Sequence, residues 1–201
     1  AWVDRGGLLQ VGPESAGSVP GPACYGQGNT RPTLTDAHVV LGRINAARPI
    51  GKLPALDVEA ARRAIVKHVA EPLQLDIMQA AEAIVRVADA RMAGAIRLVS
   101  IERGHDPAKF AAMPFGGGGA LHVGALIKEI GLKCAVVPRF PGVTSALGCL
   151  LVDVQHDFSE SYLAAIAAAD PAAIEAAFAR LEKEALDRLA HEGVAASEVV
   201  L

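Results

Sequence analysis

One glycine-rich stretch constrains the fold of this chain more than any other feature. Phe115 is followed by four glycines, Gly116 to Gly119, and then by the helix-like run Leu121 to Ile130. A short segment over residues 109–115 precedes the glycines, and an apolar run over residues 133–138 follows the helix. This order predicts a strand, a tight turn, a helix closed by a glycine, and a second, buried strand. Such a βαβ-like unit indicates an α/β class of fold.

The turn itself has two possible interpretations. A glycine has no Cβ, so it accepts positive φ and lets a ligand approach the backbone, while the N-terminus of the next helix offers free N–H groups. That combination suits a nucleotide. Close packing between a strand and a helix calls for glycine for the same steric reason. Taken alone, Gly116 to Gly119 favour packing over nucleotide binding.

Helical patterns occupy much of the remaining chain. Apolar residues recur at helical spacing over residues 58–69, 75–101 and 171–191, and a small-residue helix is expected after the turn at residues 141–142. Many of the apolar positions are alanines, which predicts close helix packing. Residues 1–34 are interrupted by glycine and proline and predict ordered loop with short strands. This segment forms either a surface loop or one wall of a binding cleft.

Two groups of polar residues have a spacing that could serve a metal. Asp36 and His38 lie in residues 33–42, which predict a strand ending in a short helix, and i, i+2 residues share one face of a strand. We prefer Asp36 as the cap of the helix that follows it, because two ligands do not make a metal site. The second group is Asp153, His156 and Asp157. We interpret it as a polar strand leaving the core, so no metal site is predicted.

Composition excludes several classes of protein. The formal charge of −3 gives no reason to expect a nucleic-acid partner, and no apolar run approaches the roughly 20 residues that span a bilayer. We therefore expect a cytoplasmic protein. Cys24, Cys134 and Cys149 are far apart and lack CxxC spacing, which predicts reduced thiols without a disulfide framework. Because the chain begins at Ala1 without methionine, we expect it to be a piece of something longer.

Several stretches together resemble the hydantoinase A / 5-oxoprolinase family, the group that contains the A-type subunit of N-methylhydantoinase and the acetone carboxylase β subunit. The matching stretches are residues 11–17, 20–26, 35–37, 41–42, 95–97, 103–107, 115–122, 137–138, 141–142 and 145–148. Four positions in or directly beside these motifs depart from the family pattern. Gly118 and Ala120 stand at the alanine and proline of the usual Gly-Gly-Ala-Gly-Pro, Val123 stands where alanine is usual, and His38 stands where asparagine is common.

The resemblance implies a fold and a place within it. Family members are longer, and their ATPase region resembles the actin / sugar kinase / Hsp70 fold, with two RNase-H-like lobes. The family's phosphate loop is missing here, so residues 1–157 look like the second lobe and residues 158–201 like the start of a C-terminal domain. In that fold a glycine turn of the second lobe holds the adenosine, which the resemblance assigns to Gly116, Gly117, Gly118 and Gly119. The implied cofactors are ATP and Mg²⁺.

The implied activity is opening of a cyclic amide, such as a hydantoin or 5-oxoproline, coupled to ATP hydrolysis. A chain without the phosphate loop should be inactive alone, and its catalytic residues stay unassigned. The resemblance also implies a homo-oligomer and a B-type partner subunit. Two alternatives remain open: a non-catalytic scaffold lobe that docks the B-type subunit, and a lobe of a related carboxylase subunit.

Overall fold

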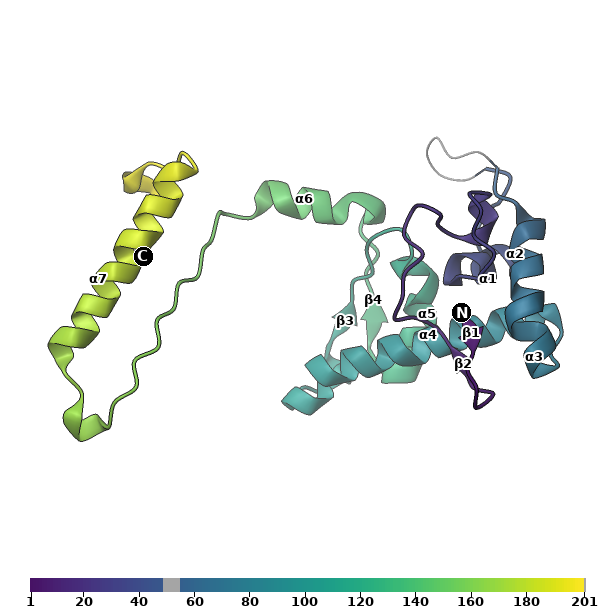
Figure 1. The fold of residues 1–201 in the computed structure, drawn as a ribbon, viewed down its shortest axis with the longest axis horizontal. Helices are drawn as coiled ribbons and strands as arrows, with labels where there is room; N and C mark the ends of the chain where they lie inside the picture. Colours follow the sequence, from purple (N-terminus) through teal and green to yellow (C-terminus); the bar gives the residue numbers. More distant parts are fainter. Residues whose placement is uncertain (49–54, 201) are drawn as a thin grey trace. The chain divides into compact units, whose positions relative to one another are not determined.

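The computed structural model describes residues 1–48 and 55–200. The strands are β1 (Trp2–Val3), β2 (Leu9–Gln10), β3 (Ala111–Ala112) and β4 (Cys134–Ala135). The helices are α1 (Leu34–Val40), α2 (Val58–Ile65), α3 (Glu71–Leu73), α4 (Ile77–Val99), α5 (Gly119–Ile130), α6 (Thr144–Leu151) and α7 (Pro171–His191). The chain forms two compact units, residues 1–148 and 149–201, which are described separately (Figure 1).

The core of the first unit lies where α1 and α2 pack against the N-terminal half of α4 (Figure 1). Alanines at 37, 61, 80 and 81 are fully buried there, beside Ile65 and Ile84. An alanine brings two helix backbones close together, and the larger side chains fill the remaining space. The close packing predicted from the alanine content is confirmed.

Residues 33–36 do not form the predicted strand. Thr33 is the N-cap of α1, and its hydroxyl accepts a hydrogen bond from the backbone N–H of Asp36 over 3.3 Å. The Asp36 carboxylate accepts the backbone N–H of Thr33 in return, over 2.7 Å, which completes a capping box. The prediction that Asp36 caps a helix following it was therefore wrong. Threonine suits both a strand and an N-cap, so the local pattern could not separate the two.

The helix predicted from residue 58, with an expected end near Pro72, has this extent in the structure. After α2 the backbone makes a π-helical turn, η2 (Val66–Ala70), and continues as α3 to Leu73. Pro72 is the second-last residue of this continuous helical segment, which ends at Leu73. The long helix α4 begins after Asp76, whose carboxylate accepts the N–H of Gln79 over 2.9 Å, and this N-cap agrees with the prediction.

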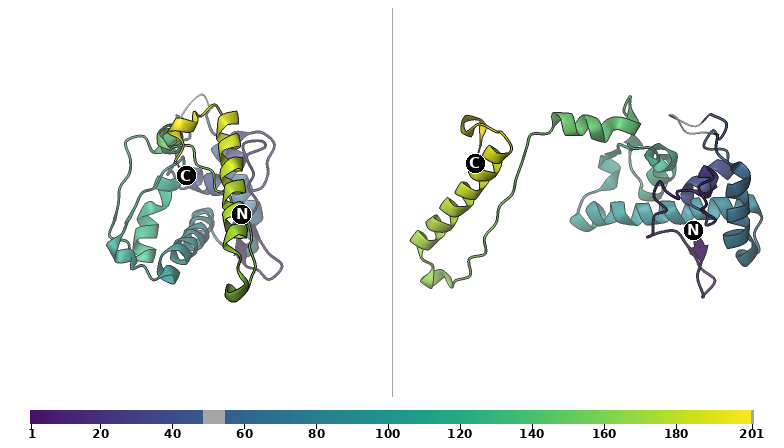
Figure 2. Two further views of the ribbon diagram at one scale, coloured as in Figure 1. Left: turned by 90° about the vertical axis from the view of Figure 1, so that its left-hand side faces the viewer. Right: turned by 45° about the horizontal axis from the view of Figure 1, so that its top comes forward.

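The predicted βαβ-like unit is confirmed in its connectivity. Strands β3 and β4 pair in parallel, Ala111 opposite Cys134, and α5 connects them and packs against α4 (Figure 2). Gly131 ends α5 in a left-handed conformation with φ 79°. The strands are only two residues long, however, and the prediction of a buried second strand was wrong, because Val136 and Val137 remain about half exposed. Within α5 only His122 and Ile130 are buried.

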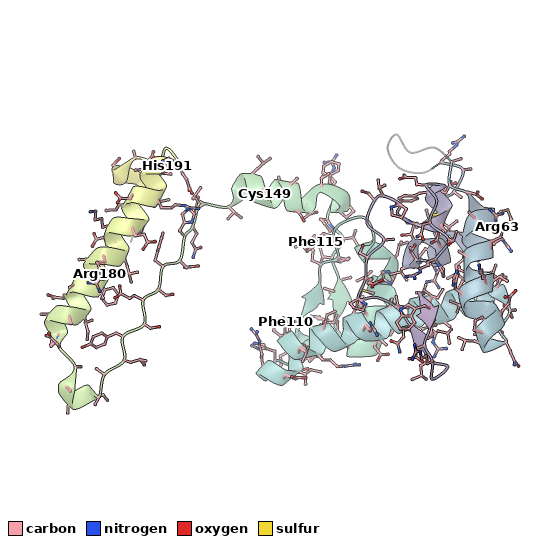
Figure 3. The ribbon with its side chains drawn as sticks, in the orientation of Figure 1. Arg63, Phe110, Phe115, Cys149, Arg180 and His191 are labelled. Atoms are coloured by element: carbon pink, nitrogen blue, oxygen red, sulfur yellow. The ribbon has the colours of Figure 1, made fainter. Side chains whose placement is uncertain are left out.

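The second unit, residues 149–201, contains α7, the segment that leads to it and the short helix η7 (Ala196–Glu198). Asp170 caps α7 by accepting the N–H of Ala172 over 3.0 Å, with Pro171 at the first position, as predicted. Residues 153–157 form no strand, contrary to the prediction. Two side-chain pairs hold the preceding segment to the helix, Arg180 with Glu160 at 2.6 Å and His156 with Glu192 at 2.8 Å (Figure 3).

Candidate functional site

The glycine turn links the end of β3 to the first turn of α5. Phe110 directly precedes β3, and Phe115 lies between β3 and the glycines (Figure 3). Gly116 has φ 81°, a conformation that residues with a Cβ rarely adopt. Its N–H group donates to the carbonyl oxygen of Pro141 over 2.7 Å, so the turn is tied to the loop that precedes α6. The backbone itself therefore requires glycine at position 116.

The other three glycines are not equivalent. A Cβ at Gly119 would touch Pro114 at 3.5 Å, which is ordinary van der Waals contact. At Gly117 and Gly118 a Cβ would meet nothing within 4 Å, and neither residue has a positive φ. Backbone conformation thus explains Gly116, whereas neither a positive φ nor close packing requires glycine at Gly117, Gly118 or Gly119. The missing side chains at Gly117 and Gly118 leave open space beside the backbone.

The N-terminus of α5 faces the turn without a side-chain cap. Gly118 is the N-cap residue, it provides no capping hydrogen bond, and the first turn carries no acidic side chain. The first N–H groups of a helix lack partners inside the helix and carry partial positive charge. The turn can therefore accept a polar or anionic group close to the backbone.

Three buried or nearly buried side chains from three helices meet beside the first turn of α5, directly after the glycine turn. His122 of α5 lies with its Nδ1 atom 2.6 Å from Oδ1 of Asp89 in α4. Its Nε2 atom is 3.2 Å from Nε2 of His38 in α1, and the two rings meet edge to face. The exposed fractions of His38 and His122 are 2% and 5%. These three residues form the Asp89–His122–His38 chain.

The protein environment holds His38 in its neutral form. Burial, the neighbouring His122 and Arg43 together lower the pKa of His38 to about 4. Its Nδ1 atom has no hydrogen-bond partner among the described residues. A buried acceptor without a partner is better tolerated than a buried N–H donor without one, so we assign the His38 proton to Nε2.

Asp36 lies away from His38, although the two are close in sequence. On a helix an i, i+2 pair points to different faces. The Asp36 carboxylate accepts the backbone N–H groups of Ala23 and Cys24 at 3.1 and 2.8 Å, which fixes the short helix η1 (Ala23–Tyr25) on α1. Burial and Asp36 raise the pKa of the Cys24 thiol to about 12. The structure thus gives Asp36 a structural role.

The second predicted polar group is also dispersed. His156 pairs with Glu192, and Asp157 contacts Gln155 at 3.4 Å. Within residues 1–48 and 55–200, no group of three His, Cys, Asp or Glu side chains is placed to hold a metal ion.

An apolar cavity of about 470 Å³ lies between α4, β3 and α5 in the first unit. Phe115 and Gly119 line it at the turn, and Met92 and Leu126 line it from the two helices. His122 also reaches its wall. The cavity therefore connects the glycine turn with the Asp89–His122–His38 chain.

A sequence comparison identifies the family. The model of a family described as Hydantoinase/oxoprolinase matches residues 1–158. The chain belongs to this family. The resemblance inferred from its motifs is confirmed.

Two relatives place the chain within the hydantoinase/oxoprolinase family. It is 42% identical to the alpha subunit of caprolactamase from Pseudomonas jessenii over 78% of its length, which covers 23% of that protein. It is 27% identical to the acetone carboxylase beta subunit of Xanthobacter autotrophicus over 96% of its length, or 28% of that protein. The chain thus spans about a quarter of the length of these curated relatives.

Solved structures agree with this assignment. The ATP-dependent caprolactamase from Pseudomonas jessenii matches with a TM-score of 0.68 and 43% identity, covering 75% of this chain and 22% of that one. A nucleotide-free acetone carboxylase matches with a TM-score of 0.74 and 26% identity, covering 99% and 29%. Both support a helix-rich α/β fold. In the part of the hydantoinase/oxoprolinase chain that the structure describes, no helix is long and apolar enough to cross a membrane.

Sequence reasoning on this hydantoinase/oxoprolinase chain missed the partnership of His122 with Asp89 and His38. These residues lie 33 and 84 positions from His122. A usable signal was the position of each side chain on the apolar stripe of its helix. A polar residue at such a position needs a buried partner, and the partner lies on another helix.

Proposed function

We propose that this chain is part of an ATP-dependent enzyme that opens cyclic amides. Residues 1–157 would form the second lobe of an actin-like ATPase region, and residues 158–201 would begin a further domain. The glycine turn, Gly116 to Gly119, would contact the adenosine side of ATP. Support comes from relatives named caprolactamase and 5-oxoprolinase, and from the similarity to a solved caprolactamase that is ATP-dependent. A B-type partner subunit, a homo-oligomer and a cytoplasmic location stay predictions.

One observation carries the proposal for the turn. Gly117 and Gly118 have no side chain although neither φ nor packing requires a glycine there. Open space at two successive residues, in front of an uncapped helix N-terminus, lets a nucleoside approach the backbone closely. The same positions would be costly to keep as glycine without a function, because glycine gains entropy in the unfolded chain.

Transfer of the γ-phosphoryl group of ATP to the amide oxygen, with ADP as the leaving group, would make the amide carbon a better electrophile for water. The described residues contribute backbone N–H groups and a shaped wall, and they include no side chain that we assign as catalytic. They also lack a three-ligand cluster for Mg²⁺, so we assign no residue of this chain to the metal. This proposal therefore predicts that the 201-residue chain alone has no turnover of a cyclic amide.

Binding of a fluorescent ATP analogue to the full-length polypeptide that carries this chain tests the proposal. Gly117→Val adds a branched side chain to the open space, and we expect affinity to fall at least about tenfold. Gly124→Val is the matched control. Gly124 lies within α5 and not in the turn, and a Cβ added there also meets no atom within 4 Å. Equal affinity of both variants and the unsubstituted protein would refute a nucleotide contact at the turn.

A docking role remains the second candidate, and exposed apolar side chains in the first unit favour it. Met113, Val136, Val137 and Phe140 near the β3–β4 pair are 52–62% exposed. Large apolar side chains that are exposed in the same region of a protein are typical of an interface. Relatives with subunit names, including the acetophenone carboxylase gamma subunit of Aromatoleum aromaticum, are consistent with a multi-subunit assembly.

The docking candidate is tested by co-purification with a B-type subunit. Val137→Asp should abolish complex formation in size-exclusion chromatography while ATP-analogue affinity stays unchanged. If the complex survives this substitution, the β3–β4 surface is not the docking site. A subunit of a related carboxylase would use the same glycine turn and the same β3–β4 surface. Only the substrate turned over by the complete complex would distinguish a carboxylase subunit from a cyclic-amide hydrolase.

A further inference from the structure

The Asp89–His122–His38 chain joins three helices that are separate in sequence. Asp89 belongs to α4, His122 to α5 and His38 to α1. Both ring nitrogens of His122 are within hydrogen-bonding distance of a partner, at 2.6 Å and 3.2 Å. Few side chains of α5 are buried, so this contact is a main anchor of its first half.

The positions of the protons follow from the partners. The carboxylate of Asp89 can only accept, so Nδ1 of His122 donates to it. With its proton on Nε2, neutral His38 donates to the lone pair on Nε2 of His122. Each polar atom of the His122 ring then has a partner of the correct kind, which defines one orientation of the ring.

The ring orientation matters because of where His122 lies. It follows Gly118, the N-cap of α5, by four residues, so it is on the first turn of the helix. A side chain that is held at both ends fixes the rotation of that turn about the helix axis. The glycine turn joins this first helical turn directly, so fixing the helical turn also restricts the conformation of the glycine turn.

We propose that Asp89 and His38 are positioning residues that act through His122 to hold the glycine turn in its ligand-accepting conformation. The proposal rests on the proposed function only in naming ATP as the ligand. The hydrogen-bond geometry makes a claim about the turn that can be tested without nucleotide.

Hydrogen–deuterium exchange on the full-length polypeptide, without nucleotide, is the first test. His38→Leu removes the donor to His122, and we expect amide exchange of residues 116–124 to quicken about tenfold. His38→Gln should restore slow exchange, because its amide nitrogen takes the place of Nε2 and still donates. His68→Leu is the matched control, a second histidine of the first unit with a buried unpartnered ring nitrogen. It should leave residues 116–124 unchanged.

Asp89→Ala removes the other partner of His122 and provides a second, independent test by hydrogen–deuterium exchange. We expect it to quicken exchange in the same residues, and the double variant with His38→Leu to show less than the product of the two single effects, because both act through His122. Unchanged exchange at 116–124 in folded His38→Leu would overturn the proposal. Failure of His38→Gln to rescue would also overturn it, since packing and not the donor would then be responsible.

Affinity for the fluorescent ATP analogue separates this proposal from the proposed function. If both hold, His38→Leu weakens binding about tenfold and His38→Gln does not. If the unsubstituted protein binds no nucleotide, the proposed function fails, and the exchange arms still decide whether Asp89 and His38 position the turn. If exchange changes as expected but affinity does not, the positioning role for ATP is refuted.

Discussion

Cys24 and Asp36 are joined by a hydrogen bond of 2.8 Å from the backbone N–H of the cysteine to a carboxylate oxygen of the aspartate. The same carboxylate accepts the backbone N–H of Ala23 and both the N–H and the hydroxyl of Thr33. Asp36 is fully buried. One side chain therefore satisfies donors from the N-terminal loop and from the start of α1, and this accounts for much of the order of that loop.

Asp36→Ala should lower the free energy of unfolding by at least about 3 kcal/mol, because it leaves several buried donors without an acceptor. Asp36→Asn should cost less, since one oxygen remains. Urea denaturation measures both. Asp57→Ala is the control: Asp57 caps α2 by accepting one exposed hydrogen bond from the backbone N–H of Ala60, and its loss should cost only about 1 kcal/mol. Equal losses at 36 and 57 would contradict this account.

Stability should fall in mild acid because of His38. Its folded-state pKa of about 4 lies below the ordinary value of 6.5, so the unfolded chain binds a proton first. The contribution is fully present above pH 6.5 and is lost as the pH falls toward 4, by about 3 kcal/mol in total. Urea denaturation at several pH values between 7.5 and 4.5 measures the slope.

His38→Gln should flatten that slope, because glutamine does not titrate. A smaller slope would remain, since burial also lowers the pKa of His68 and acts in the same direction. If His38→Gln has the same pH dependence as the unsubstituted protein, His38 does not have the lowered pKa assigned to it.

Two neighbouring glycines of the turn should respond oppositely to alanine. Gly116→Ala should destabilise the fold by about 1–2 kcal/mol, because the residue has a positive φ. Gly117→Ala should be neutral or slightly stabilising, because the added methyl meets nothing and the unfolded chain loses entropy. Thermal unfolding of the two variants decides the matter. A large loss at Gly117 would mean that the open space beside it is filled by other parts of the protein.

The three cysteines should differ in reactivity toward a thiol reagent. Cys24 is buried, and burial with Asp36 nearby raises the pKa of its thiol to about 12, so little thiolate is present at pH 8. Cys134 and Cys149 are exposed. Titration of the native 201-residue chain should therefore show two fast thiols, with the third appearing only in denaturant. Three fast thiols would show that the Cys24 environment opens readily.

The sequence predicted the helical parts of this fold well and the strands poorly. Periodicity and caps located α4 and α7 to within about two residues, because both helices begin at an aspartate N-cap and have a sustained apolar stripe. Strands β3 and β4 were predicted as longer, and only the second of them was predicted as buried. Val136 and Val137, at the end of the predicted second strand, are about half exposed, which no local pattern reports, since burial depends on what covers a sheet.

The candidate site was predicted in part. Local rules identified the glycine turn and the C-terminal glycine of α5, because backbone conformation depends on neighbouring residues. They could not find the contact between His38 and His122, which forms only after α1, α4 and α5 have packed. Spacing along the chain also misplaced Asp36 and His38 on one face, because the segment is a helix and not a strand.

The hydrogen bond from Gly116 to Pro141 couples two places that a motif search treats as separate. Any ligand that shifts the turn must either move the loop over residues 140–143 with it or break this bond. Residues 140–143 are thus mechanically linked to the turn, and a spectroscopic probe attached there would report an event at the turn from outside it. Movement can thus pass from the turn to residues 140–143 through this one hydrogen bond, without a change in the core formed by α1, α2 and α4.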